Sequence, residues 1–440
     1  MSKNKTRNIF ITSTLILILG GAITKILGMV IKIFTTRIVG TEGIGLYMMI
    51  MPTFNLFITL SQLGFPIAIS KLVSEDKKNN RKIIFSTIAF SLMFNTILIF
   101  LIFLLAPIFS NILLKNSNTY LPIICIGFTL PFIGISSITR GYFFGKQKMI
   151  PHVVSNVFEQ VVRLIIIIII TPKLLTYGIN VAVAGLVIYN VVSELLSIVI
   201  LYFYLPKNFK FKKEEIKPDK TLLKEVMEIS IPTTSSRLIG SIGYFLEPII
   251  LTQTLLFVGY TSNFITTEYG VVSGYAMQML LMPSFFTMAI SQALIPVISK
   301  GYANNKIKYV KSRIKQACLI SFSIGFLITL IIFLFPEFFL KLFFNTTDGV
   351  SYLRLLAPFF LIFYLEGPLT SSLQAMNKAK KAFKVSFKGI IYKTIILFVS
   401  CLFKIGMYPL VIANIFNIIY VTYNQFKIVK NSLNEKTLQN

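Results

Sequence analysis

Long, uninterrupted runs of apolar residues are the feature that most constrains this chain. A helix needs about 20 consecutive apolar residues to cross the hydrocarbon core of a bilayer, whereas a spanning β-strand needs only about ten residues in alternation. The runs here are continuous, and the chain as a whole is 55% hydrophobic and only 13% charged. No water-soluble class has this composition. The sequence therefore predicts an all-α integral membrane protein and excludes an outer-membrane barrel.

We predict twelve membrane-spanning helices. The amino-terminal run begins at Ile9, after Lys3, Lys5 and Arg7, and continues past Gly28 without a small-residue cleavage site. It is therefore interpreted as the first span and not as a signal peptide. The predicted helices cover residues 9–36, 44–70, 83–109, 120–139, 153–171, 178–205, 226–256, 269–298, 316–336, 350–373, 386–403 and 407–426.

Several predicted helices contain internal prolines. Proline removes a backbone donor and clashes with the preceding turn, so it bends or breaks a helix. The positions are Pro52, Pro66, Pro131, Pro232, Pro248, Pro283 and Pro296. Broken helices are common in transporters, although most proline kinks only adjust packing.

The distribution of Lys and Arg predicts the orientation. The formal net charge is +27. In a soluble chain this would suggest nucleic acid, but beside apolar spans basic residues simply set membrane orientation. The amino end, every second connection and the carboxyl tail hold 32 of the 43 basic residues, and the opposite connections hold 6. Both termini are therefore predicted to be cytoplasmic, in a multi-pass protein of the bacterial plasma membrane.

An internal repeat divides the chain. Residues Met51-Pro52-Thr53-Phe54, Ser61-Gln62, Pro66 and Ile69-Ser70-Lys71 recur as Met282-Pro283-Ser284-Phe285, Ser291-Gln292, Pro296 and Ile298-Ser299-Lys300, about 230 positions later. Because each half has an even number of crossings, both halves have the same orientation and enclose a central cavity. The predicted parts are a six-helix lobe (1–205), a basic cytoplasmic linker (206–221), a second six-helix lobe (222–426) and a cytoplasmic tail (427–440).

Besides Glu228, Arg354 and Lys388 near span ends, nine charged residues lie inside the predicted spans. Each costs about 3 kcal/mol on insertion scales, so most should line a cavity or pair with one another. Glu159 and Arg163 have the i,i+4 spacing of a helical ion pair. Lys25 and Lys32 are seven residues apart and share a helix face. Lys393 can snorkel to the cytoplasmic surface. The full set is Lys25, Lys32, Arg163, Arg237 and Lys393 with Glu159, Glu194, Glu247 and Glu366.

Several chemistries lack the residues they need. Cys125, Cys318 and Cys401 lie in apolar runs without metal-ligand spacing, and His152 is the only histidine. The segment Gly141–Lys146 is one residue short of a phosphate loop and lacks the following Ser or Thr. We therefore expect no catalytic residues, no cofactor, no metal site, no ATPase and no nucleic-acid partner.

Some segments resemble a known family. They are Thr24-Lys25-Ile26-Leu27-Gly28, Thr36–Tyr47, Arg140–Gly145 and Ser236-Arg237-Leu238-Ile239 with Glu247. These are similar to the stage V sporulation protein B-like polysaccharide transporters of the multidrug/oligosaccharidyl-lipid/polysaccharide (MOP, MATE-like) exporter superfamily. The resemblance implies two six-helix lobes and alternating-access movement of undecaprenyl-diphosphate-linked sugars, such as lipid II, between leaflets. Relatives usually have fourteen helices, and lipid II flippases carry charges in helices two and eight, whereas 44–70 and 271–298 hold none here.

The chemistry of such a substrate makes three cations the candidate site. A diphosphate headgroup needs fixed positive charge in a wet cavity, and Lys25, Lys32 and Arg237 are the candidates. Glu247, Glu366, Glu159, Arg163 and Arg140 are candidate coupling or structural charges. A cation-coupled multidrug exporter, which would use carboxylates such as Glu247 or Glu366, is one alternative, and a non-transporting scaffold of a cell-wall synthesis complex is another. The expected partners are a lipid-linked sugar, membrane lipids and cell-wall synthesis proteins.

Overall fold

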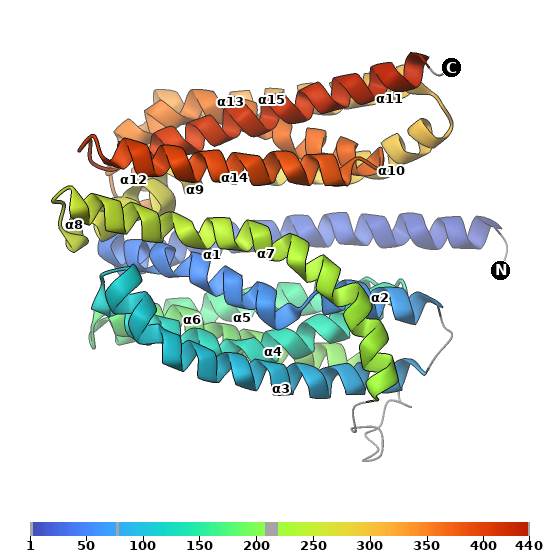
Figure 1. The fold of residues 1–440 in the computed structure, drawn as a ribbon, viewed down its shortest axis with the longest axis horizontal. Coiled ribbons are helices and arrows are strands. Elements are labelled where there is room, and N and C mark those ends of the chain that lie inside the picture. Colours follow the sequence, from blue (N-terminus) through green and yellow to red (C-terminus); the bar gives the residue numbers. More distant parts are fainter. Residues whose placement is uncertain (1–2, 76–78, 207–218, 439–440) are drawn as a thin grey trace. The chain divides into compact units, whose positions relative to one another are not determined.

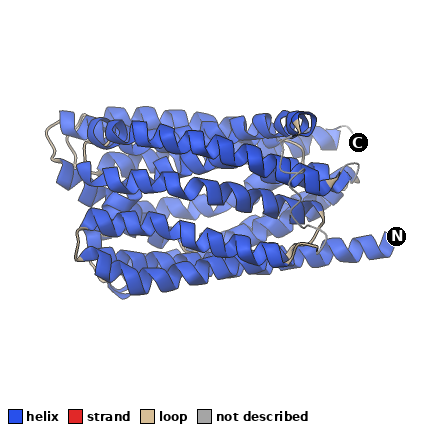
Figure 2. Cartoon of the chain, turned by 90° about the horizontal axis from the view of Figure 1, so that it is seen from below, coloured by secondary structure: helices blue, strands red, loops and turns tan. Residues whose placement is uncertain are grey.

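The protein is all-helical in the computed structural model, which describes residues 3–75, 79–206 and 219–438 (Figure 2). Within these ranges there is no β-strand. The all-α prediction is therefore confirmed. The helices are α1 (Lys3–Gln62), α2 (Phe65–Glu75), α3 (Asn80–Pro107), η1 (Ile108–Leu113), η2 (Ser117–Thr119), α4 (Tyr120–Gly145), α5 (Ile150–Leu175), α6 (Ile179–Phe203), α7 (Lys220–Phe257), α8 (Ser262–Tyr269), η4 (Gly270–Ala276), α9 (Met277–Leu281), α10 (Ser284–Ala303), α11 (Ile307–Leu334), α12 (Pro336–Phe344), α13 (Val350–Ala375), α14 (Ala379–Cys401) and α15 (Tyr408–Leu438).

The described helices contain eight segments that are long and apolar enough to cross a membrane, or nine if one bent pair is a single span. Each of the twelve predicted spans consists mostly of helical residues. The spans predicted at 386–403 and 407–426 lie in α14 and α15, which are outside that set. The total of twelve and the orientation of the termini remain predictions.

Two predicted helices are broken in the structure. Residues 44–70 form the second part of α1 and the first half of α2, with a break between them because Leu63 and Gly64 have positive φ angles of 42° and 65°. Residues 269–298 bend by 52° between Leu281 and Ser284, where Pro283 cannot donate a backbone hydrogen bond. Pro66 and Pro283 are among the prolines predicted to bend or break a helix, and the helix breaks beside both of them.

Gly64 provides the first testable prediction. An alanine Cβ there would lie 3.1 Å from the Ser230 carbonyl oxygen, and its φ angle of +65° disfavours any residue with a Cβ. Gly64→Ala should therefore lower the free energy of unfolding by about 1–2 kcal/mol. At the matched control Gly21, inside a helix, nothing lies within 4 Å of a Cβ, so Gly21→Ala should be neutral or stabilising by up to about 1 kcal/mol. Thermal unfolding in detergent compares them, and equal effects would contradict this account of the break.

The chain forms two compact units, Met1–Pro248 and Ile249–Asn440. The first part of α7 belongs to the amino-terminal unit, because its Leu222 and Val226 pack in one core cluster with α2, α3 and α4 residues such as Phe65, Ile84 and Tyr142. Most of the predicted linker, residues 207–218, lies outside the described part of the chain. The division into lobes at residues 206–221 stays a prediction.

The same local geometry recurs in both units at the offset of the sequence repeat. After α4, Gln147 has a φ of 56°, and the Lys148 backbone N–H donates to the Phe143 carbonyl. After α13, Asn377 has a φ of 59°, and the Lys378 N–H donates to the Leu373 carbonyl. Both helices therefore end in the same left-handed cap, 230 residues apart. The two helix caps are therefore separated by the same offset as the repeated sequence motifs.

Asp219 joins the start of α7 to α3. Its carboxylate lies 2.8 Å from the Lys82 ammonium and accepts hydrogen bonds from Thr221 and from the Leu222 backbone N–H. Its backbone N–H donates to the Ser86 hydroxyl at 3.2 Å. The Lys82 contact, together with the Thr221 and backbone donors, holds the pKa of Asp219 well below its usual range. A helix-capping carboxylate thus anchors α7 to the amino-terminal unit.

The depressed pKa makes a pH-dependent prediction. A carboxylate with a lower pKa in the folded state stabilises the fold above its unfolded pKa of about 3.9, and this contribution is lost as the pH falls through the folded pKa. Asp219→Asn should therefore lower the thermal midpoint at pH 7, and the difference from wild type should shrink as the pH falls below about 4. A difference that is independent of pH would show that the charge of Asp219 is not responsible.

Candidate functional site

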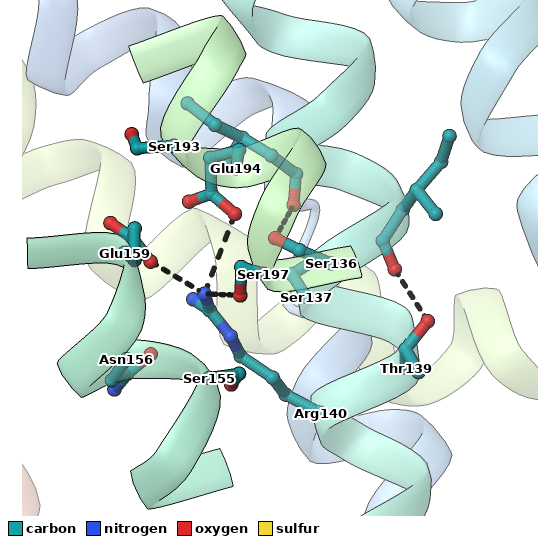
Figure 3. Close-up of polar contacts among 12 residues, drawn as sticks. Ser136, Ser137, Thr139, Arg140, Ser155, Asn156, Glu159, Ser193, Glu194 and Ser197 are labelled. Atoms are coloured by element: carbon teal, nitrogen blue, oxygen red, sulfur yellow. Dashed lines mark hydrogen bonds and ion pairs between the residues drawn. The ribbon is translucent and has the colours of Figure 1, made fainter. Parts of the chain in front are cut away.

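Four charged side chains meet inside the amino-terminal unit, between α4, α5 and α6. Figure 3 shows three of them, Arg140, Glu159 and Glu194. The Arg140 Nη2 atom donates to Glu159 Oε2 at 2.8 Å, to Ser197 Oγ at 2.9 Å and to Glu194 Oε2 at 3.4 Å. The Arg163 Nη2 atom donates to Glu159 Oε1 at 2.7 Å. Both arginine side chains are less than one-fifth exposed and both carboxylates less than one-tenth. We call these four residues the charge cluster.

Glu159 is the centre of the charge cluster, since each of its two oxygens accepts from a different arginine. The ion pair with Arg163 follows from i,i+4 spacing on α5, and that prediction is confirmed. The Arg163 Nη2 atom also donates to Ser193 Oγ on α6 at 3.2 Å. These bonds cross from α5 to both neighbouring helices and fix the packing of three helices through polar contacts.

The charge cluster is formally neutral, with two arginines and two carboxylates. Burying any one of them alone would be costly, and mutual pairing offsets that cost only while all partners are present. The Nε atoms of Arg140 and Arg163 have no hydrogen-bond partner among the described residues. The cluster therefore has no net positive charge with which to bind a multiply charged anion. Its geometry is that of an ion-pair network that holds α4, α5 and α6 together.

Sequence reasoning missed the central role of Arg140. The predicted helix stopped at residue 139 and left Arg140 at a cytoplasmic end, whereas α4 continues to Gly145 and buries the side chain against α5 and α6. That boundary was wrong. Arg140 and Glu194 are 54 positions apart, so no local pattern pairs them.

The charge cluster is not repeated in the carboxyl-terminal unit. At the 230-residue offset, Arg140, Glu159, Arg163 and Glu194 correspond to Thr370, Gly389, Lys393 and Asn424. Nearby, the Thr370 hydroxyl bonds to the Gln425 side-chain oxygen at 2.8 Å. Only the Arg163 position keeps its charge, as Lys393. The two units therefore differ in their internal charges at the positions that the sequence repeat relates.

Two of the three candidate substrate cations lie on the first arm of α1. Lys25 and Lys32 are both exposed, seven residues apart on one helix, as predicted from their spacing. α1 turns at Gly40, the one residue of the helix with non-helical angles, and both ends of α1 lie on the same side of Figure 1. Lys25 has no hydrogen-bond or ion-pair partner among the residues that the structure describes.

The third cation, Arg237, lies on the part of α7 that belongs to the amino-terminal unit. Its side chain is exposed, and its Nη2 atom donates to Gln62 Oε1, at the end of α1, at 3.2 Å. One turn further along α7, the Ser241 hydroxyl lies 3.0 Å from the Thr59 hydroxyl of α1. Lys25, Lys32 and Arg237 thus belong to one unit, on α1 and α7. At the 230-residue offset, Arg237 aligns with Arg7 and not with Lys25.

The remaining predicted charges lie apart from the charge cluster. Glu247 is buried near the end of the amino-terminal unit, with 8% of its surface exposed. Glu366 is half-buried on α13, and Lys393 is half-buried on α14. His152 lies on α5, where its ring packs edge-on against Phe144 at 4.7 Å. Within the described residues, no three His, Cys, Asp or Glu side chains are grouped so that they could hold a metal ion.

Comparison with known proteins places this arrangement in a family. Residues 10–302 match the family described as polysaccharide biosynthesis protein, and residues 242–399 match the MatE family. Stage V sporulation protein B of Bacillus subtilis is 38% identical over 400 residues, which cover 89% of this chain and 77% of that protein. The chain belongs to the polysaccharide biosynthesis protein family.

A second sequence relative and a solved structure extend the comparison. The lipid II flippase MurJ of Bacillus subtilis is 26% identical over 329 residues, which cover 69% of this chain and 60% of that protein. A solved inward-facing multidrug resistance MATE family transporter of the MOP superfamily superimposes with a TM-score of 0.76 at 14% identity, covering 94% of this chain and 95% of that one. The chain is therefore a multi-pass membrane protein with the MOP fold.

Proposed function

We propose that the protein is a flippase that moves undecaprenyl-diphosphate-linked sugars across the bacterial plasma membrane by alternating access, with both termini in the cytoplasm. The observation that carries the proposal is the 38% identity with a sporulation protein over most of both chains, within a family of polysaccharide biosynthesis proteins. Lipid II and related polysaccharide precursors are the substrates that we favour. Cell-wall, spore-cortex or polysaccharide synthesis would then use the sugars after they reach the outer leaflet.

The proposed site for the diphosphate consists of Lys25, Lys32 and Arg237. A diphosphate carries about two negative charges and loses part of its hydration when it enters the membrane, so it requires fixed cations. Lysine supplies a compact point charge, while the planar guanidinium of arginine can bind two phosphate oxygens at once. Exposed side chains on α1 and α7 leave these cations accessible to a ligand, in contrast to the arginines of the charge cluster, which are buried and paired with carboxylates.

The competing function is export of organic cations. The match of residues 242–399 to the MatE family and the buried position of Glu247 favour it, because a carboxylate can hold a cationic drug. The proposed lobes and central cavity fit both substrates. The two functions differ in the sign of the charge that the protein must bind.

A competition experiment separates these functions. The purified protein would be titrated with a fluorescent undecaprenyl-diphosphate sugar, and then with unlabelled lipid-linked sugar or with ethidium as competitor. We expect the unlabelled anionic lipid to displace the probe and ethidium to leave it bound. If ethidium binds and the lipid-linked sugar does not, the flippase proposal is wrong and the exporter is supported. A protein that binds neither would point to the scaffold of a cell-wall synthesis complex.

A further inference from the structure

The outward face of α14 changes from basic to apolar along a single stripe. Lys380, Lys384 and Lys388 are exposed at intervals of four residues, and Lys381 lies beside them on the same side of the helix. The same stripe continues with Ile391, Ile395 and Phe398, which are 41%, 52% and 49% exposed. The opposite face packs into the carboxyl-terminal unit through Ala382, which belongs to one core cluster with residues of α10, α11, α13 and α15.

This change in polarity locates the membrane surface on α14. Exposed isoleucine and phenylalanine on a membrane protein face lipid tails, while exposed lysine requires water or a headgroup. The transition between Lys388 and Ile391 therefore places the four lysines at the depth of the lipid headgroups. Phe383 and Phe387, each 37% exposed, stack with centroids 6.3 Å apart at the edge of the same stripe. Basic and aromatic side chains together are typical of a helix segment that contacts the headgroup layer.

No acidic residue close in sequence neutralises the positive charge of this surface. No Asp or Glu occurs between Gly367 and Asn434, a stretch that includes all of α14. Phosphate diesters of the lipid headgroups are the anions present at this depth, so the surface is complementary to anionic phospholipid.

The internal repeat shows that the fold does not require these lysines. At the 230-residue offset, Lys380, Lys381, Lys384 and Lys388 correspond to positions on α5 that hold no charge, namely Ile150, Pro151, Val154 and Phe158. Helix α5 starts at the corresponding place in its own unit, after the equivalent cap. Membrane orientation and helix packing are therefore possible without a basic stripe at this place, and the stripe on α14 needs a separate explanation.

We infer that the basic stripe of α14, formed by Lys380, Lys381, Lys384 and Lys388, is a binding surface for anionic phospholipid headgroups of the cytoplasmic leaflet. The lysines bind the phosphate oxygens, and Phe383 and Phe387 insert among the first carbons of the acyl chains. Bound phospholipid would hold α14 at a fixed depth in the membrane. This inference is independent of which substrate the protein transports.

Native mass spectrometry of the full-length protein in neutral detergent tests the inference. The probes are dioleoyl phosphatidylglycerol and, as the zwitterionic reference, dioleoyl phosphatidylcholine. The variant carries Lys381→Gln, Lys384→Gln and Lys388→Gln, and the matched control carries the same change in net charge at exposed positions elsewhere, Lys173→Gln, Lys341→Gln and Lys404→Gln. We expect the α14 variant to bind phosphatidylglycerol roughly tenfold more weakly, or worse, while the control stays within about threefold of wild type.

Several outcomes would overturn the inference. Unchanged phosphatidylglycerol binding by the α14 variant would remove its basis, and equal losses in variant and control would show that only net charge matters. A third variant, with arginine at the same three positions, keeps the charge and should bind as wild type does, so a loss there would also contradict the proposal. Displacement of phosphatidylglycerol from wild type, but not from the α14 variant, by a lipid-linked diphosphate sugar would assign the stripe to substrate instead.

Discussion

Replacing Lys25 or Arg237 by alanine should remove most transport of lipid-linked sugar while leaving the amount of protein in the membrane unchanged. Each charge-assisted contact with phosphate contributes about 1.5–3 kcal/mol, so losing one should weaken substrate binding roughly ten- to a hundred-fold. Lys25 is exposed and has no polar partner among the described residues, so its removal leaves no buried group unsatisfied. Transport in proteoliposomes and membrane abundance by immunoblot would be measured together.

Three control variants accompany this prediction: one keeps the charge at residue 25, one removes a charge at another position, and one removes the hydrogen-bond partner of Arg237. Lys25→Arg keeps the charge and should retain part of the transport activity. Lys173→Ala removes an exposed lysine at the end of α5 and should transport as wild type does. For Arg237, the variant Gln62→Ala removes the hydrogen-bond partner without removing the cation, so it should affect transport less than Arg237→Ala. Wild-type transport by both alanine variants would make these cations structural and would remove the main support for an anionic substrate.

Glu159→Gln should destabilise the protein by about 3–5 kcal/mol, because it breaks two buried ion pairs, one with Arg140 and one with Arg163. Arg163 would lose its carboxylate partner, and the only carboxylate left to Arg140 would be that of Glu194, whose oxygen lies at 3.4 Å. Thermal unfolding in detergent measures the change. Glu42→Gln is the matched control, since Glu42 is exposed and should change stability by less than about 0.5 kcal/mol.

A double variant tests whether charge balance is the reason. Glu159→Gln combined with Arg163→Gln removes one negative and one positive charge and leaves Arg140 with Glu194. It should be more stable than Glu159→Gln alone, because the remaining buried charges are balanced again. If the double variant is less stable by the sum of the single changes, the pairing within the charge cluster has no energetic role.

Features set by local spacing could be predicted from the sequence. The all-α membrane fold follows from the length of the apolar runs, and the Glu159–Arg163 pair follows from i,i+4 spacing on one helix. The repeat was visible as matched motifs, and the paired caps at Gln147 and Asn377 give it a structural counterpart. These features depend on residues close in sequence or on copies of the same pattern.

Features set by tertiary contacts could not be predicted in this way. Arg140 meets Glu194 across 54 positions and Arg237 meets Gln62 across 175, and no periodicity links such residues. The grouping of the start of α7 with the amino-terminal unit depends on Asp219, Leu222 and Val226, whose partners lie on other helices. Pro66 predicted a bend or break in this helix, but the apolar run continues through Leu63, so only the φ angles of Leu63 and Gly64 locate the turn.

The central claim is that this protein moves a lipid-linked sugar between leaflets, and one measurement tests it directly. The protein would be reconstituted into vesicles that contain undecaprenyl-diphosphate-linked sugar, and the fraction of sugar accessible to a membrane-impermeant enzyme would be followed with time. The account predicts that accessibility rises quickly in vesicles with wild-type protein and only at the slow rate of protein-free vesicles when Lys25→Ala and Arg237→Ala are combined. Equal rates in wild-type and protein-free vesicles would contradict it.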